Sequence, residues 1–285
     1  MLDPHPLLGR DVVVDGVRLH VVAHGRTGGV PLLLLHGVPT SSYLWRNVMR
    51  DLESKVPTVA PDLVGLGRSE RPRRRGYRLT EQAALLHGLL DELALPQVVV
   101  AGHDEGGAVA LQLAAMAPDR VIGIALLGSP LHAHAWPPPA VVPLLLPGVG
   151  EAYAALLRRH QHVARRLVGR LSARELGHYR APWRAPDGAR SLLRLVRAMD
   201  LRETATALEI LGADCPPVLV LWGTEDRVRS AAYGRRLADE LPGAVFVPVS
   251  GGGHLLPEEC PERVAEELAG FVAELPVALS QSADQ

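Results

Sequence analysis

Short apolar runs that alternate with longer helical patterns restrict the fold of this chain more than any other feature. Several of these runs are continuously apolar, which is typical of strands buried on both faces of a parallel sheet. The eight runs are residues 12–14, 19–22, 31–35, 58–60, 97–101, 121–127, 217–222 and 244–247. Helical patterns stand between most of them, at residues 42–53, 80–93, 106–116, 231–240 and 261–274. Because Asp15 and Gly16 between the first two runs indicate a hairpin, the sequence predicts an α/β fold with a mostly parallel eight-stranded sheet that begins antiparallel and is flanked by helices.

The alternation is interrupted between Leu131 and Leu211. This segment has a helical pattern, is rich in arginine, and contains Trp136 followed by three prolines. An apolar strand pattern resumes directly after it. We expect the interruption to be a helical cap inserted over the sheet. The predicted organisation is an α/β core formed by residues 1–130 and 212–285, with the cap at residues 131–211.

The composition excludes several classes of function. The chain has 30 Lys and Arg against 31 Asp and Glu, and this net charge of −1 excludes a globally basic nucleic-acid binder. Two cysteines form neither a disulfide framework nor a zinc set, and no apolar run is long enough to span a membrane. The N-terminus lacks the pattern of a signal peptide. We therefore expect a cytoplasmic protein that acts on a small molecule without a metal or cofactor. The sequence does not indicate its oligomeric state.

The segment G-H-D-E-G, residues 102–106, joins a predicted strand to a predicted helix. Glycines at both ends of this segment permit a sharp turn with a strained residue at its apex. This pattern predicts a nucleophile elbow in which Asp104 replaces the more usual serine. The alternative is a simple glycine-rich turn in which Asp104 caps the helix.

Two further residues follow predicted strands in the order that a catalytic triad requires. Asp226 comes just after the strand at residues 217–222, and His254 ends the glycine-rich segment S-G-G-G-H after the last strand. The order of Asp104, Asp226 and His254 is the nucleophile, acid and histidine order of α/β-hydrolases. These three residues are the predicted catalytic residues.

The chain resembles the α/β-hydrolase superfamily over nearly its whole length. The resemblance is carried by the elbow and by three other segments, H-G-V-P-T-S-S-Y-L-W-R-N at 36–47, A-P-D-L-V-G-L-G-R-S at 60–69 and Y-R-A-P-W at 179–183. It is strongest to the branch that contains haloalkane dehalogenases, epoxide hydrolases and haloacetate dehalogenases. The resemblance implies an oxyanion hole formed by the backbone N–H groups of Val38 and Glu105.

An aspartate nucleophile favours particular substrates. A carboxylate that attacks an sp³ carbon bearing a leaving group forms a stable alkyl ester, whereas attack on an ester carbonyl would form a strained anhydride. Water activated by the histidine then hydrolyses the alkyl ester. Asp104 therefore indicates opening of a carbon–halogen or epoxide bond.

Two departures from the family favour an epoxide over a halide. Haloalkane dehalogenases usually hold the halide with an asparagine and a tryptophan, and the corresponding positions here are Val38 and Glu105. Haloacetate dehalogenases usually place an arginine where Glu105 stands. We therefore predict an epoxide hydrolase. The alternatives are a haloalkane or haloacid dehalogenase with an atypical halide site, and a non-hydrolytic protein that binds a ligand or catalyses a cyclisation or isomerisation.

Several other side chains are candidates for contact with the substrate. The resemblance implies a cap tyrosine as proton donor, and Tyr153 is the candidate for it. Glu105 is a second possible donor if Asp104 raises its pKa, although its side chain could instead point away from the pocket. The remaining candidate contacts are His36, His103, Trp136, Tyr179 and Trp183. Packing is the simpler interpretation of Tyr179, and it is an equal alternative for Tyr153.

Overall fold

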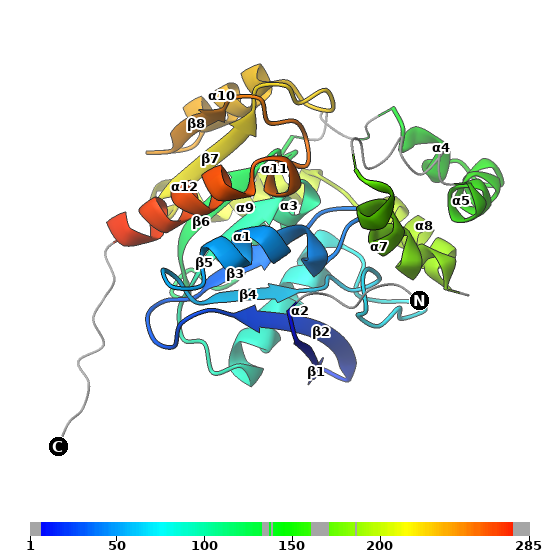
Figure 1. Ribbon diagram of the computed structural model, residues 1–285, viewed down its shortest axis with the longest axis horizontal. Coiled ribbons are helices and arrows are strands. Elements are labelled where there is room, and N and C mark those ends of the chain that lie inside the picture. Colours follow the sequence, from blue (N-terminus) through cyan, green and yellow to red (C-terminus); the bar gives the residue numbers. More distant parts are fainter. Residues whose placement is uncertain (1–6, 133–136, 138, 161–170, 186, 276–285) are drawn as a thin grey trace.

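The computed structural model describes residues 7–132, 137, 139–160, 171–185 and 187–275. Its centre is an eight-stranded sheet with the strand order β1-β2-β4-β3-β5-β6-β7-β8 (Figure 1). The strands are β1 (Gly9–Val14), β2 (Val17–His24), β3 (Leu32–Leu35), β4 (Thr58–Pro61), β5 (Val98–His103), β6 (Val121–Leu127), β7 (Val218–Gly223) and β8 (Val245–Val249). Strand β2 pairs antiparallel with β1 and β4, and all other neighbouring strands are parallel. The predicted fold class is confirmed.

The hairpin between β1 and β2 turns at the predicted dipeptide. Asp15 and Gly16 both have positive φ angles, of 48° and 72°. These angles match the twist of a two-residue hairpin, and aspartate and glycine are among the residues that tolerate them. The strands furthest inside the sheet have no exposed residue, which explains why their sequences are continuously apolar.

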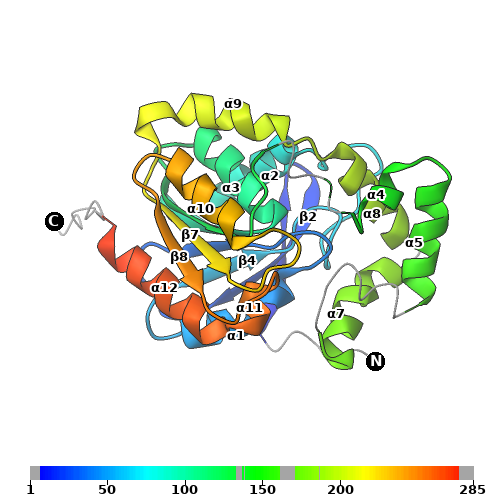
Figure 2. The ribbon, with the colours of Figure 1, turned by 90° about the horizontal axis from the view of Figure 1, so that it is seen from above.

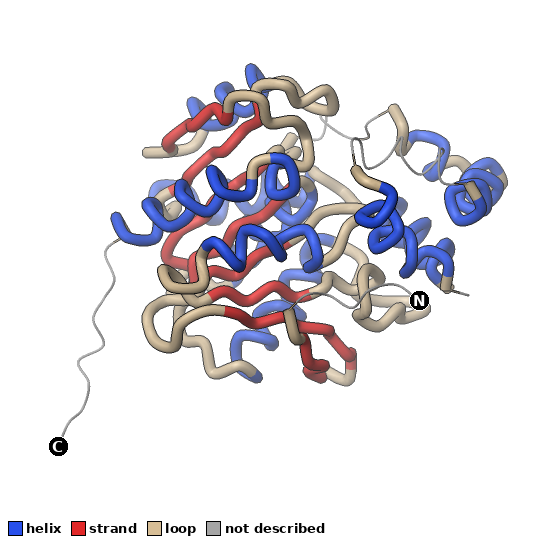
Figure 3. The backbone as a smooth tube through the Cα atoms, viewed as in Figure 1, coloured by secondary structure: helices blue, strands red, loops and turns tan. Residues whose placement is uncertain are grey.

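Helices cover both faces of the sheet (Figure 3). One face carries the 3-10 helix η1 (Ser42–Trp45), α1 (Arg46–Asp51), α11 (Leu256–Glu259) and α12 (Pro261–Glu274). The other face carries α2 (Leu79–Glu92), α3 (Glu105–Met116), α9 (Arg202–Leu211) and α10 (Ala231–Glu240). Each face has its own buried apolar cluster, so the sheet is the shared wall between two hydrophobic cores.

The segment that interrupts the α/β alternation is helical. Its helices are α4 (Val142–Leu145), α5 (Val149–Arg159), α7 (Ala173–Arg184) and α8 (Gly188–Ala198), and they lie together beyond one end of the sheet (Figure 2). Helix α9, by contrast, packs on α3, and its residues Ala207 and Leu211 belong to the apolar cluster of the core. The short 3-10 helix η3 (Gly212–Asp214) then leads into β7. The division into a core at 1–130 and 212–285 and a cap at 131–211 stays a prediction.

No helix in the described part of the chain is long and apolar enough to cross a membrane.

Candidate active site

Asp104 lies at the apex of a strained turn between β5 and α3. Its φ and ψ angles are 53° and −126°, a combination that is costly for a residue with a side chain. The flanking glycines make the turn possible, because an added Cβ would lie 2.4 Å from the backbone of Gly106 if placed on Gly102, and 2.5 Å from the carbonyl oxygen of Leu35 if placed on Gly106. Asp104 precedes α3 but its side chain makes no capping hydrogen bond. The alternative of a simple helix cap is therefore wrong.

The structure brings Asp104, Asp226 and His254 together at the carboxyl ends of three parallel strands. Nδ1 of His254 lies 3.0 Å from Oδ2 of Asp226, and Nε2 of His254 lies 3.8 Å from Oδ1 of Asp104. His254 and Asp226 are therefore hydrogen-bonded, whereas the distance between His254 and Asp104 is too long for a hydrogen bond. Oδ1 of Asp226 accepts the backbone N–H groups of Val228 and Arg229, which fixes the orientation of this carboxylate. The histidine is thus held by one carboxylate and faces the other.

Arg229 is the residue that the sequence analysis missed. Its Nη1 donates to Oδ1 of Asp104 at 2.6 Å and to the carbonyl oxygen of Gly128 at 3.2 Å. Only 5% of its side chain is exposed. Burial raises the pKa of Asp104, but the charge of Arg229 and a hydrogen bond with Glu105 outweigh burial, so this pKa lies below its ordinary value. Asp104 is therefore a carboxylate at neutral pH.

Glu105 turns its side chain toward Asp104 and not away from it. Oε2 of Glu105 accepts the backbone N–H of Val38 at 2.8 Å, and its carboxyl group is also hydrogen-bonded to Asp104. Burial and the neighbouring charge of Asp104 raise the pKa of Glu105 well above its usual range. The site thus contains two adjacent carboxyl groups whose pKa values are shifted in opposite directions.

This arrangement corrects the predicted oxyanion hole. The N–H of Val38 was expected to be available to the reacting group together with the N–H of Glu105. In the structure the carboxyl group of Glu105 already binds the N–H of Val38. The pair of Val38 and Glu105 is therefore not a free oxyanion hole in this conformation.

Two histidines that were predicted to contact the substrate have structural partners instead. His36 is fully buried; its Nδ1 donates to the carbonyl oxygen of Gly37, and its Nε2 accepts the N–H of Leu63. His103 is also buried, and its Nε2 donates to the backbone carbonyl oxygen of His254 at 2.8 Å. Burial lowers the pKa of His103 to about 4, so this ring is neutral at pH 7. Both histidines hold the loops of the site in place.

Two aromatic candidates of the cap, Tyr179 and Trp183, are also buried. The hydroxyl of Tyr179 donates to Glu258 in α11, and burial together with the charge of Glu258 raises the pKa of this tyrosine well above its ordinary value. Trp183 is buried in the apolar cluster. Tyr179 therefore joins α7 to α11 of the core, and the packing alternative for Tyr179 fits the structure. Tyr153 lies half-buried on α5, and Trp136 lies outside the described residues.

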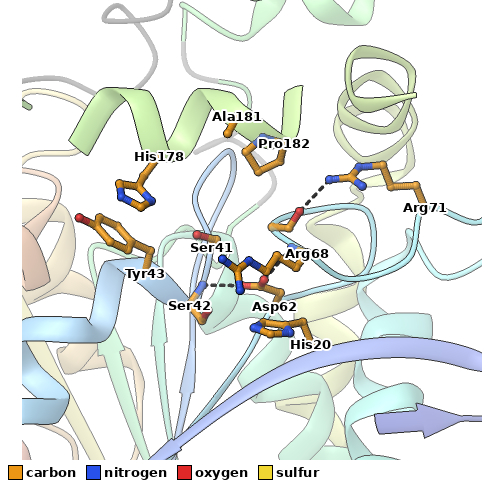
Figure 4. A pocket seen from close by; sticks show the side chains of 11 residues that line it. His20, Ser41, Ser42, Tyr43, Asp62, Arg68, Arg71, His178, Ala181 and Pro182 are labelled. Atoms are coloured by element: carbon orange, nitrogen blue, oxygen red, sulfur yellow. Dashed lines mark hydrogen bonds between the residues drawn. The ribbon is translucent and has the colours of Figure 1, made fainter. Parts of the chain in front are cut away.

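A cavity of about 380 Å³ lies between the core and α7 (Figure 4). It is lined from the core by the segment after β3 and the segment after β4, and from α7 by His178, Ala181 and Pro182. His178 stacks on Tyr43 with ring centroids 4.0 Å apart. None of the three triad residues lines this cavity. It is therefore separate from the site around Asp104.

Residues 30–261 match the family described as alpha/beta hydrolase fold. The chain belongs to the α/β-hydrolase family. This α/β-hydrolase is 30% identical over 262 residues to haloalkane dehalogenase 2 of Mycobacterium tuberculosis. The match spans 87% of this chain and 89% of the relative. It is also 29% identical over 269 residues to an uncharacterised hydrolase of Bacillus subtilis. That match spans 92% of this chain and 97% of the relative.

The solved structures agree with the relatives. The crystal structure of a haloalkane dehalogenase from Bradyrhizobium elkani matches this α/β-hydrolase with a TM-score of 0.80 at 29% sequence identity, over 93% of this chain and 97% of that one. The chain is thus a member of the branch of α/β-hydrolases that resembles dehalogenases and epoxide hydrolases. The branch predicted from its motifs is confirmed.

Proposed function

We propose that this hydrolase opens epoxides through an ester on Asp104, which water activated by His254 and Asp226 then hydrolyses. The observation that supports an epoxide is the buried carboxyl group of Glu105 beside the nucleophile, whose pKa burial raises well above its usual range. A halide leaves as an anion and needs N–H donors, whereas the oxygen of an opened epoxide needs a proton. A buried carboxylic acid next to Asp104 offers that proton.

In the first step, a carboxylate oxygen of Asp104 attacks an epoxide carbon. The carbon–oxygen bond of the ring breaks, an ester bond forms, and the released oxygen takes the proton of Glu105. Asp104 suits this role because its pKa is lowered, and Glu105 suits its role because its pKa is raised. Two adjacent carboxyl groups with opposite pKa shifts divide the work of nucleophile and acid.

In the second step, water attacks the carbonyl carbon of the Asp104 ester. Nε2 of His254 takes a proton from this water, and Asp226 holds the imidazole through Nδ1. As the ester bond breaks, the proton on His254 passes to the leaving alkoxide oxygen, which completes the diol. The second proton of the water, left on the Asp104 carboxyl group, returns to Glu105 directly or through solvent, so that Asp104 is a carboxylate again. The 3.8 Å between His254 and Asp104 is consistent with a water placed near both groups.

A paired screen tests the choice of substrate. We expect diol formation from aryl and alkyl epoxides to be at least about 100-fold faster than halide release from short haloalkanes, because one missing donor to a leaving anion already costs that much. The measurement is diol production by chromatography and halide release by ion detection, with the same enzyme preparation. Rapid halide release without diol would replace the proposal by the dehalogenase alternative.

The variant Glu105→Gln sharpens this screen. Glutamine still accepts the N–H of Val38 and donates to Asp104, but it has no proton to give. We expect epoxide opening to fall by about two to four orders of magnitude. Halide release should not fall, because the amide N–H is a better halide donor than a carboxyl group. Equal losses on both substrates would show that Glu105 serves the structure and not the proton transfer.

The raised pKa of Glu105 predicts that the stability of the protein depends on pH, and Glu105→Gln tests this dependence. The pKa of Glu105 is higher in the folded than in the unfolded chain, so the folded state loses stability as the pH rises above the unfolded value. Glutamine lacks this titration. The stability of Glu105→Gln relative to the wild type should therefore increase between about pH 5 and about pH 8, by at most about 1.4 kcal/mol per pH unit. Urea unfolding at both pH values measures the difference, and a pH-independent difference would contradict the raised pKa.

A further inference from the structure

Hydrolysis of the proposed ester places a negative charge on a former carboxylate oxygen of Asp104. We propose that Arg229 is a catalytic residue that stabilises this oxyanion through a hydrogen bond to Oδ1. The inference rests on the proposed ester mechanism, and it adds a charged side chain to the three residues of the predicted triad. Arg229 also replaces a donor of the expected oxyanion hole, because the N–H of Val38 is already bound by Glu105.

The two oxygens of Asp104 have different surroundings. Oδ1 accepts Nη1 of Arg229 at 2.6 Å and lies 3.8 Å from His254. Oδ2 lies on the side of the loop after β3, where an added Cβ on Gly37 would be 3.0 Å from it. The oxygen without the arginine, Oδ2, is the better nucleophile, because a bound cation lowers the energy of the lone pairs on Oδ1. Attack by Oδ2 leaves Oδ1 as the carbonyl oxygen of the ester, still facing Arg229.

Arg229 also has contacts other than its ion pair with Asp104. Its backbone N–H donates to Asp226, and its carbonyl oxygen accepts Nε1 of the buried Trp222 at 2.9 Å. Its Nη1 also binds the carbonyl oxygen of Gly128. Among the described residues, its Nε and Nη2 have no hydrogen-bond partner. The guanidinium therefore stays beside Oδ1 when the ester forms, as a preorganised donor must.

The charge of the Asp104 carboxyl group changes twice along the reaction. It is negative in the resting enzyme, neutral in the ester, and negative again in the tetrahedral intermediate. Arg229 interacts favourably with the first and third states and least with the ester. Its charge therefore slows formation of the ester and accelerates hydrolysis of the ester, since only interactions that strengthen on the way to the transition state increase a rate.

Replacing Arg229 should affect formation and hydrolysis of the Asp104 ester in opposite directions, and this difference is the test. In Arg229→Met, we expect the ester to hydrolyse at least about 100-fold more slowly, while its formation is unchanged or faster. The ester should become the main form of the enzyme during turnover. Rapid quenching after mixing with an epoxide, followed by mass spectrometry of the intact protein, measures both rates in mildly alkaline buffer, which keeps Asp104 ionised without its arginine.

Two further variants keep the test decisive. Arg227→Met removes an exposed arginine of the same loop and should behave like the wild type. Arg229→Lys keeps the charge but loses the planar donor, so it should lengthen the lifetime of the ester by a smaller factor, and it decides the question if Arg229→Met does not fold. An unchanged ester lifetime in Arg229→Lys, or equal slowing of both steps in Arg229→Met, would overturn the role of Arg229. Absence of any ester in the wild type and in His254→Gln would instead overturn the proposed function.

Discussion

Replacing Asp104 by alanine is expected to abolish turnover, with a loss of at least about four orders of magnitude. Alanine has no oxygen to attack the substrate, and no other carboxylate occupies the apex of the elbow. Asp104→Asn should be equally inactive at first, because an amide is a poor nucleophile. It should recover slowly as deamidation, or attack by the water that His254 activates, restores the aspartate. Initial rates on an epoxide, followed over hours for the asparagine variant, measure both effects.

Stability distinguishes the two variants at Asp104. Alanine leaves the buried Arg229 without the acceptor that Oδ1 provides, and an uncompensated buried charge costs about 3–5 kcal/mol. Asparagine can still accept the guanidinium hydrogen bond, so it should destabilise the protein less. Thermal unfolding of both variants is the control for the activity measurement. A folded Asp104→Ala with wild-type turnover would show that the reaction does not pass through Asp104.

Replacing His254 by glutamine is expected to stop the reaction after its first step. The attack by Asp104 does not use the histidine, whereas the second step needs a base to take a proton from water. Steady-state turnover should fall by about three orders of magnitude or more, within the range for loss of a general base. One equivalent of substrate should still be consumed. Rapid mixing with a chromogenic epoxide would record a single burst of consumption without release of diol.

The control for His254→Gln is the residue behind the histidine. The ring of His103 lies beside that of His254 but, among the described residues, its side chain hydrogen-bonds only the backbone of His254, so His103→Gln should retain both steps within about tenfold. Continued turnover of His254→Gln at the wild-type rate would contradict its role as the base. Loss of the burst in His254→Gln would show that the histidine is needed before the ester forms.

Local patterns were sufficient to predict most of the fold. Helix α10 occupies the predicted range of residues 231–240, and the hairpin turns at Asp15 and Gly16. The predicted helix at residues 42–53 is instead the 3-10 helix η1 followed by a short α1. Its first turn is set by a distant residue, because Asp62 accepts the backbone N–H of Ser42. Periodicity along the chain contains no information about such a contact.

Local patterns also predicted some residues of the site, whereas contacts between residues far apart in the sequence could not be predicted. Asp104, Asp226 and His254 each follow a strand, so the sequence places them at one edge of the sheet. Arg227 and Arg229 look alike in the sequence, yet only Arg229 is buried, and its partner Asp104 lies 125 residues away. The contact between Val38 and Glu105 spans 67 residues. The roles of these residues depend on the packing of distant loops, which no local pattern encodes.

The covalent intermediate on Asp104 is tested most directly by mass spectrometry of His254→Gln after mixing with an epoxide. The protein is expected to gain the full mass of the epoxide, and peptide mapping is expected to place this mass on the peptide that contains Asp104. With a haloalkane, the same experiment would add the alkyl group without the halogen if the dehalogenase alternative holds. A variant that stays unmodified by every epoxide and haloalkane, or one that carries the added mass on a different residue, would contradict the ester mechanism.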